Sequence, residues 1–215
     1  LREAQPERIA YLHGRASLWF EQNDLLPEAI RHALAASDYE RAADMIEKIW
    51  LVMDLSYQSA TWLGWAKALP VDQIRARPVL CVGYAWALLA VGEIEASEDR
   101  LRDAERWLEP AENPRADWPS RMMVVDEAEF RSLPASIAAA RAYRALALGD
   151  ISSTKMYARE ALAHDPEGVS IHHTQAILVN SQPQPTSDLL AFLDLGDGLV
   201  QGANLEHIRV VPALF

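Results

Sequence analysis

The sequence predicts an all-α protein built from antiparallel helix-hairpin repeats. Apolar residues recur every three to four positions along most of the chain, as they do on one face of a helix. Turn-forming residues fall where such helices should end, and small residues recur at similar distances after them. Runs that alternate with period two are short and β-branched clusters are few, so we expect no sheet.

The first helix should begin at Pro6 and end at Asp24, and Pro27 suits the first turn of the next helix. Asp38 separates this second helix from a third, which begins at Tyr39. The third helix has one apolar face, formed by Ala42, Ala43, Ile46, Ile49, Trp50 and Met53. These boundaries predict three helices in the first quarter of the chain.

Gly92 and Gly149 each close an apolar helix and precede a new one, as a residue with left-handed backbone would. The helix that follows Gly92 has a charged outer face, on which Glu98 and Arg102 form a favourable pair four residues apart. The alanine-rich stretch at 135–148 is apolar nearly all round. We expect other helices to cover it on more than one side.

The stretch at 110–119 reads as a loop. Residues 122–130 read as a helix whose carboxylates are exposed, namely Asp126, Glu127 and Glu129. The helical pattern weakens towards the end of the chain. We therefore expect residues 1–167 to hold the repeats, and residues 168–215 to be a divergent repeat or a capping segment.

Small residues recur at matching positions after the predicted turns: Ala29, Ala33, Ala36, Ala43, Ser97, Ala104, Thr154, Ala158 and Ala161. Two antiparallel helices pack closely where small side chains let their ridges interlock. A turn, a small-residue seam and a terminal proline are typical of the tetratricopeptide repeat, which has a period of about 34 residues. The sequence therefore predicts a tetratricopeptide-like array that coils into a right-handed superhelix with a concave inner surface.

Charge and composition exclude several functions. The net charge of −11 disfavours direct contact with nucleic acid, and the apolar runs are too short for a membrane helix. The single cysteine, Cys81, should be a buried apolar residue in a reducing compartment. The chain begins at Leu1 without a signal peptide, so we expect a fragment of a longer protein or a trimmed terminus.

The first half also contains an ordered series of motifs. It comprises Leu-His at 12–13, Ala-Ser-Leu-Trp-Phe at 16–20, Glu-Ala-Ile-Arg-His-Ala-Leu-Ala-Ala at 28–36, Ala-Ala-Asp-Met-Ile-Glu at 42–47, Trp65, Leu-Pro at 69–70, Arg-Pro-Val-Leu-Cys at 77–81 and Ala-Trp-Ala-Leu at 85–88. The series resembles the helical sensor segment of the large ATP-binding LuxR-type, or MalT-like, transcriptional regulators. The resemblance covers roughly residues 5–166.

The resemblance implies a cytoplasmic regulator with a nucleotide-binding module before this segment and a helix-turn-helix DNA reader after it. It also implies that a small-molecule inducer or a regulatory protein binds the sensor, which contacts the other domains of its parent. The sequence itself has no phosphate-loop motif, so we expect no cofactor here and ATP only in the missing module. The alternative is a generic tetratricopeptide-like scaffold for protein–protein interaction.

Two groups of residues are candidates for a ligand-binding groove: the aromatic set Tyr57, Trp62, Trp65 and Trp86, and the basic pair Arg141 and Arg144. Aromatic faces suit sugar rings or apolar ligands, but aromatic residues at helical spacing are more often core. Ser56, Gln58, Ser59 and Thr61 make the stretch around Tyr57 and Trp62 polar, which favours the groove for these two.

Arg141 and Arg144 could bind an anion, or they could pair with carboxylates of a neighbouring helix, such as the one that carries Glu160. Adjacent His172 and His173 point about 100° apart on a helix, and no third ligand follows, so we predict no metal site. No hydrolase or metalloprotease motif is present. We therefore expect no catalytic residues and no enzymatic activity.

Overall fold

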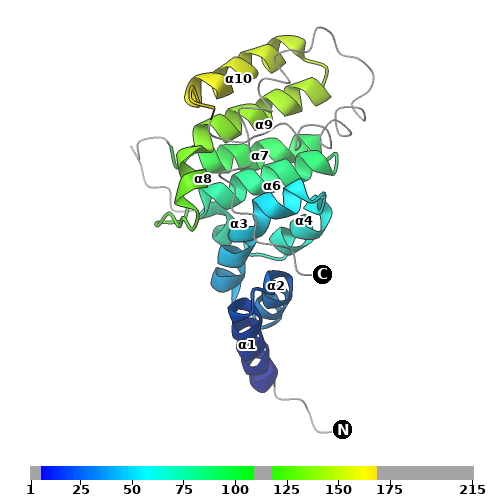
Figure 1. The fold of residues 1–215 in the computed structure, drawn as a ribbon, viewed down its shortest axis with the longest axis vertical. Coiled ribbons are helices and arrows are strands. Elements are labelled where there is room, and N and C mark those ends of the chain that lie inside the picture. Colours follow the sequence, from blue (N-terminus) through cyan, green and yellow to red (C-terminus); the bar gives the residue numbers. More distant parts are fainter. Residues whose placement is uncertain (1–5, 109–117, 169–215) are drawn as a thin grey trace. The chain divides into compact units, whose positions relative to one another are not determined.

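A computed structural model describes residues 6–108 and 118–168 of the chain. All of these residues belong to one compact unit, Leu1–Ser181. Within them every regular element is a helix and no strand occurs (Figure 1). This confirms the predicted all-α class for the described residues. The predictions for 169–215 and for most of the loop at 110–119 lie outside the described residues.

The helices follow one another through short connections along the described residues. Their bounds are α1 (Pro6–Gln22), α2 (Leu26–Ala35), α3 (Tyr39–Leu55), α4 (Ser59–Lys67), α5 (Val71–Arg75), α6 (Pro78–Ala90), α7 (Ile94–Glu105), α8 (Glu127–Arg131), α9 (Leu133–Ala147) and α10 (Ile151–His164).

The turns between paired helices depend on residues with left-handed backbone. Asp24, Gly92 and Gly149 have φ of 58°, 82° and 76°, as the sequence predicts. The turn between α2 and α3 differs in one detail, because Ser37 takes the positive φ of 59°. Asp38 instead caps α3, since its side chain accepts a hydrogen bond from a backbone N–H in the first turn.

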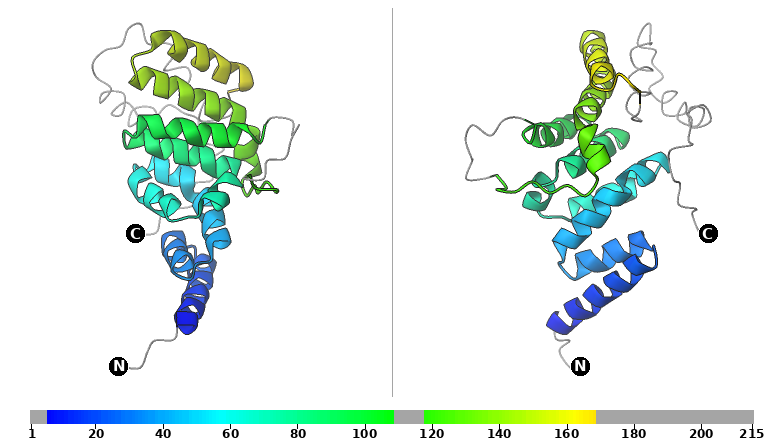
Figure 2. Two further views of the ribbon diagram at one scale, coloured as in Figure 1. Left: turned by 180° about the vertical axis from the view of Figure 1, so that it is seen from behind. Right: turned by 60° about the vertical axis from the view of Figure 1, so that its left-hand side comes forward.

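Consecutive helices pack as pairs, most extensively α1 with α2, α6 with α7 and α9 with α10 (Figure 2). Helix α6 lies at the centre of the described helices and contacts α3, α4, α5, α7, α8 and α9. Its sequence is apolar almost all round and nearly all of it is buried, because neighbours cover it on several sides. The alanine-rich α9 is covered in the same way by α10, α6 and α7.

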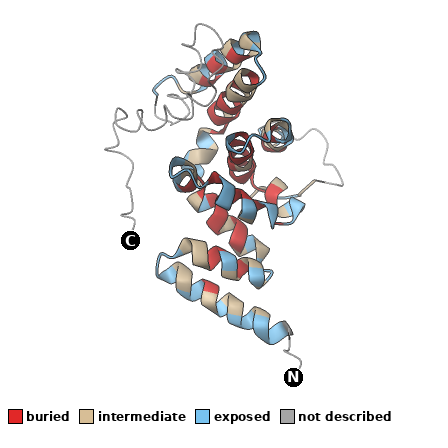
Figure 3. Ribbon diagram, turned by 90° about the vertical axis from the view of Figure 1, so that its right-hand side faces the viewer, coloured by how far each residue is buried: buried red, intermediate tan, exposed pale blue. Residues whose placement is uncertain are grey.

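The small residues predicted to form the helix contacts are buried, apart from the half-buried Ala36. They are Ala29, Ala33, Ala43, Ser97, Ala104, Thr154, Ala158 and Ala161. Figure 3 shows buried positions concentrated along the faces where helices meet. One contact is closer still: a Cβ on Gly83 would lie 3.1 Å from the Trp50 ring. Glycine at this position therefore lets α6 approach α3.

The predicted helix at 122–130 is largely wrong. Only Glu127–Arg131 is helical, and Asp126 caps this short helix by accepting hydrogen bonds from the N–H groups of Ala128 and Glu129, both at 3.0 Å. Residues 118–126, here called the strap, are not helical. The backbone N–H of Met123 donates instead to the carbonyl oxygen of Ala76 at 2.8 Å. The strap therefore satisfies part of its hydrogen bonding against the helices rather than within a helix of its own.

None of the described helices combines the length and apolar character needed to cross a lipid bilayer.

Candidate functional site

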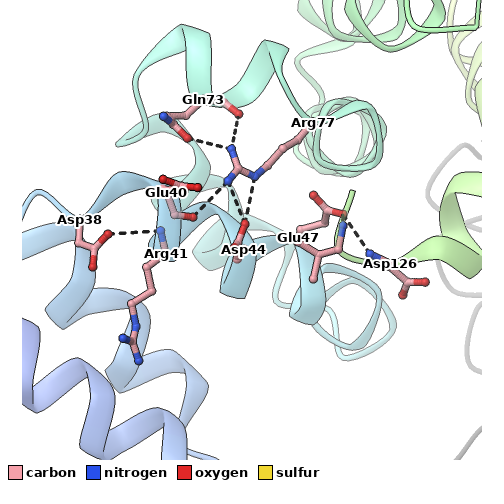
Figure 4. Close-up of polar contacts among 9 residues, drawn as sticks. Asp38, Glu40, Arg41, Asp44, Glu47, Gln73, Arg77 and Asp126 are labelled. Carbon is pink, nitrogen blue, oxygen red and sulfur yellow. Dashed lines mark hydrogen bonds and ion pairs between the residues drawn. The ribbon is translucent and has the colours of Figure 1, made fainter. Parts of the chain in front are cut away.

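The strap is held against α3 by a buried carboxylate. The Oε1 atom of Glu47 accepts hydrogen bonds from the backbone N–H groups of Val125 at 2.8 Å and Asp126 at 3.3 Å (Figure 4). Glu47 is on α3, and Val125 and Asp126 follow it by 78 and 79 residues. One side chain therefore joins two segments that are far apart in the sequence.

Glu47 lies in a desolvated environment, with only 1% of its surface exposed. Burial raises the pKa of its carboxyl group, while the two backbone hydrogen bonds and the charge of Arg77 act in the opposite direction. Its second oxygen, Oε2, is buried and has no hydrogen-bond partner among the described residues. The attachment of the strap therefore depends on one atom of an incompletely satisfied carboxylate.

Beside Glu47 lies Arg77, which is completely buried. Its guanidinium donates to Asp44 Oδ1 from Nη2 at 2.9 Å and from Nε at 3.3 Å. It also donates to the carbonyl and side-chain oxygens of Gln73 at 3.1 and 2.8 Å, and to the carbonyl oxygen of Glu40 at 3.3 Å (Figure 4). Because the guanidinium fork is rigid and fully paired, Arg77 fixes the position of the Asp44 carboxylate.

A pocket of about 480 Å³ opens between α3, the strap and α8, and it is lined by Asp44, Arg121, Met122, Met123, Val124, Val125, Glu127 and Phe130. This volume falls in the range of small-molecule sites. The lining combines five apolar side chains with three charged ones. Arg77 and Glu47 hold both walls in place, because Arg77 orients Asp44 and Glu47 accepts a hydrogen bond from the backbone N–H of Val125.

The other end of the strap is anchored by aromatic and basic side chains. The guanidinium carbons of Arg75 and Arg106 lie 5.6 and 4.6 Å from the ring centre of Trp118. The ring of Trp107 lies 6.0 Å from the same residue, and its Nε1 donates to the carbonyl oxygen of Arg75 at 2.7 Å. The buried carboxylate of Asp103 attracts both arginines. The strap is thus held at both ends.

The structure places two of the candidate tryptophans, Trp62 and Trp86, in the core. Trp62 is 1% exposed, and its Nε1 donates to the carbonyl oxygen of Ile46 at 2.9 Å. The prediction that Trp62 faces a groove is therefore wrong: the polar residues beside it lie at the start of α4, while the indole packs inward. Trp86 is also buried and donates to Ser136 Oγ at 3.3 Å.

The other two aromatic candidates lie nearer the surface. Tyr57 is 65% exposed and sits in the turn between α3 and α4 with φ of 56°. Trp65 is partly buried and packs against the core. None of the four aromatic candidates lines the pocket beside the strap, so the structure does not bring them together in one site.

Arg141 is engaged in ion pairs. Its Nη1 and Nη2 donate to the two carboxylate oxygens of Glu105, both at 2.8 Å, and Nη2 also donates to Glu98 at 3.3 Å. These hydrogen bonds lower the pKa of Glu105 despite some desolvation. The partner helix is α7, not α10 with Glu160. Arg144 is half-buried, and its Nε has no hydrogen-bond partner among the described residues.

The sequence interpretation missed Asp44, Glu47 and Arg77, which organise the pocket. A signal was present, because Asp44 and Glu47 lie three residues apart on a helix whose neighbouring positions are apolar. Carboxylates next to a buried helix face are unusual and call for a partner. Cys81 is buried as predicted, and burial raises the pKa of its thiol. In the described ranges, no group of three or more His, Cys, Asp or Glu residues could hold a metal ion.

Comparison with known proteins yields partial similarities. The chain is 34% identical over 116 residues to the serine/threonine-protein kinase PknK of Mycobacterium tuberculosis, a match that covers 54% of this chain and 10% of PknK. It is 32% identical over 101 residues to the HTH-type transcriptional regulator AlkS of Pseudomonas putida, which covers 46% of this chain and 11% of AlkS. The AlkS of Ectopseudomonas oleovorans is 29% identical over the same length.

The chain thus spans about a tenth of the length of the curated relatives it matches. No family model and no solved structure matches it. The distant similarity to AlkS is compatible with the helical domain of a transcriptional regulator.

Proposed function

We propose that this chain is the effector-sensing, tetratricopeptide-like module of an ATP-dependent, cytoplasmic regulator of the LuxR type, and that it is not catalytic in itself. The observation that carries the proposal is the pair of similarities, one to a protein named as a transcriptional regulator and one to a protein named as a kinase. A helical segment that is shared by proteins with different named activities is explained more simply as a binding module than as the source of a catalytic activity. ATP and DNA would bind to other modules of the parent protein.

The pocket supports the sensing role. Its walls come from α3 on one side and from the consecutive strap and α8 on the other. The two sides are distant in the sequence and are joined by the hydrogen bonds of Glu47. A ligand in this pocket would contact both α3 and the strap, so its binding energy would depend on how they are docked. Differential binding of this kind shifts a conformational equilibrium and can pass a signal to neighbouring domains.

The test is a thermal-shift screen of the 215-residue chain against maltodextrins and a library of small metabolites, followed by titration calorimetry. We expect at least one compound to bind saturably with one site per chain. The variant Phe130→Ala, in the pocket lining, should weaken binding, while Trp19→Ser, on the exposed face of α1, should not. Failure of every compound to bind would reject small-molecule sensing.

A second candidate is the protein-interaction role, which one observation favours. The outward face of α1 exposes four large side chains, between 45% and 61%: Tyr11, Leu12, Leu18 and Trp19. Helix α1 packs chiefly against α2, so this face has no substantial cover among the described residues. An exposed apolar patch of this kind marks interaction surfaces. Arg8 and Arg15 are exposed at the same helical spacing, and over the short range of a contact their local charge outweighs the distant acidic groups of the chain, which favours an acidic amphipathic helix as the partner.

This role can be tested with two labelled peptides, both helical and leucine-rich on one face, with flanks of glutamate in one and lysine in the other. We expect the glutamate peptide to bind the chain more tightly by fluorescence anisotropy, and Trp19→Ser to abolish the difference. Equal binding of the two peptides, or binding unaffected by Trp19→Ser, would remove the support for an interaction surface on α1.

A further inference from the structure

We infer that the pocket beside the strap binds a small organic cation, a primary ammonium group attached to an apolar body about the size of an aryl ring. This inference rests on the small-molecule form of the proposed function and specifies its ligand class. Three features of the pocket carry it: the anchored carboxylate of Asp44, the excess of negative charge in the lining, and the adaptable apolar side chains of the lining.

The carboxylate of Asp44 is held in position by Arg77 and can accept a further hydrogen bond. Its Oδ1 is occupied by two donors of Arg77, whereas Oδ2 makes no hydrogen bond among the described residues. The side chain is 38% exposed and lines the pocket. A carboxylate that is already held in place loses little freedom when a ligand binds. Its other oxygen can accept a hydrogen bond from an N–H or O–H donor, which a primary ammonium has and a quaternary one lacks.

The charge of the lining also favours a cation. Asp44 and Glu127 contribute two carboxylates, against the single guanidinium of Arg121, so the lining carries a net charge of −1 when all three are ionised. Arg121 and Glu127 are both exposed to solvent, where their charges are screened alike, so Asp44 is the least screened of the three. The chain as a whole carries −11. Local and overall charge therefore both attract a cation and repel an anion.

The apolar side chains of the lining suit an apolar body with an aromatic ring. Met122, Met123 and Phe130 line it together with two valines. Unbranched methionine side chains adapt to the shape of a ligand, and their sulfur atoms make favourable contacts with ring edges. Phe130 offers a further aromatic partner. A ligand with an ammonium group at Asp44 would place its ring among these side chains.

The test uses phenethylamine, phenethyl alcohol and phenylacetate, which share a ring and a short chain but carry a cationic, a neutral and an anionic group. Each is titrated into the full 215-residue chain by calorimetry. We expect the amine to bind at least ten-fold more tightly than the other two. Asp44→Asn should remove most of this preference, and Glu127→Gln should reduce it several-fold without disturbing the partner of Arg77.

Asp99→Asn is the matched control, because it removes the same charge from an exposed position on α7 outside the pocket. It should leave the affinity for the amine unchanged. Equal weakening by Asp99→Asn and Glu127→Gln would mean that overall charge, not the pocket, selects the amine, and would overturn the inference. Tighter binding of phenylacetate or the alcohol, or no binding by any of the three, would also overturn it. The metabolite screen described above includes ligands of every charge. A neutral or anionic metabolite that binds in that screen would therefore support the sensing function even if the amine does not bind.

Discussion

At the scale of single residues, the stability of the site depends on two buried ionisable side chains, Arg77 and Glu47, whose hydrogen-bonding groups are paired to different extents. Arg77 is surrounded by oxygen acceptors from three residues, which offset the cost of removing its charge from water. Glu47 has two donors on one oxygen and none among the described residues on the other. The two side chains should therefore respond differently to substitution.

Replacing Arg77 by methionine should lower the free energy of unfolding by about 3 kcal/mol or more, because it leaves buried oxygen acceptors without donors. The matched control is Arg31→Gln, which breaks an exposed pair with Glu28 and should cost less than about 0.5 kcal/mol. Urea denaturation measures both variants. Similar losses for the two would contradict the structural role given to Arg77.

Glu47→Gln should alter the dependence of stability on pH. Burial raises the folded-state pKa of Glu47 above its ordinary value of 4.5, so in the interval above 4.5 the folded protein binds a proton more tightly than the unfolded chain does. Lowering the pH through this interval should stabilise the wild type. Glutamine keeps an acceptor for Val125 and Asp126 but does not titrate. The thermal midpoint of the wild type should therefore rise relative to Glu47→Gln as the pH falls from neutral towards about 5; a parallel pH dependence would refute the assignment.

At the scale of the elements, the turns were readable from the sequence because they depend on local backbone conformation. Gly92 and Gly149 have positive φ, and in both cases a Cβ would meet no atom within 4 Å. The cost of a side chain here is therefore conformational strain rather than a clash. Gly64 differs in its backbone, because it lies within the helix α4 and has no positive φ. A Cβ at Gly64 would likewise meet nothing within 4 Å.

Gly92→Val and Gly149→Val should each destabilise the fold by more than ~1 kcal/mol. Gly64→Ala should instead stabilise it by about 0.5–1 kcal/mol, because alanine favours a helix interior. Thermal denaturation of the three variants measures these differences. Unchanged midpoints for both valine variants would contradict the left-handed turns.

The strap was not predictable by the same reasoning. Residues 127–131 look helical and are helical, but the conformation of residues 122–126 is set by partners elsewhere, the carbonyl of Ala76 and the carboxylate of Glu47. A local pattern carries no information about such distant acceptors. The ligand-binding groove proposed from the sequence could not be predicted correctly for the same reason. The pattern singles out Trp62 and Arg141, but their partners, Ile46 and Glu105, come from other helices.

At the scale of the described unit, the helices pack mainly with their neighbours in the sequence, and only α6 connects many of them. Stability in such an arrangement is a sum of local interfaces, so it should vary along the chain. The α1–α2 hairpin, which contacts the remainder chiefly through α2, should open most readily. The buried α6 should open last.

Limited chymotrypsin digestion tests this gradient. We expect the first cleavages at exposed aromatic residues of α1, such as Tyr11 and Trp19, well before any cleavage at Trp86, which is buried in α6. Mass spectrometry of the early fragments identifies the sites. Early cleavage at Trp86 would show that the centre of the unit is no more stable than its first hairpin.

The pocket and the function proposed for it both require the strap to be docked on α3 by Glu47. Residue-resolved amide hydrogen exchange by NMR measures this directly. Exchange at the backbone N–H groups of Val125 and Asp126 should be strongly slowed in the wild type and should speed up at least ten-fold in Glu47→Ala, while amides in the centre of α9 keep their rates. Rapid exchange at Val125 and Asp126 in the wild type would show that the strap is not docked, and the pocket would lose one of its walls.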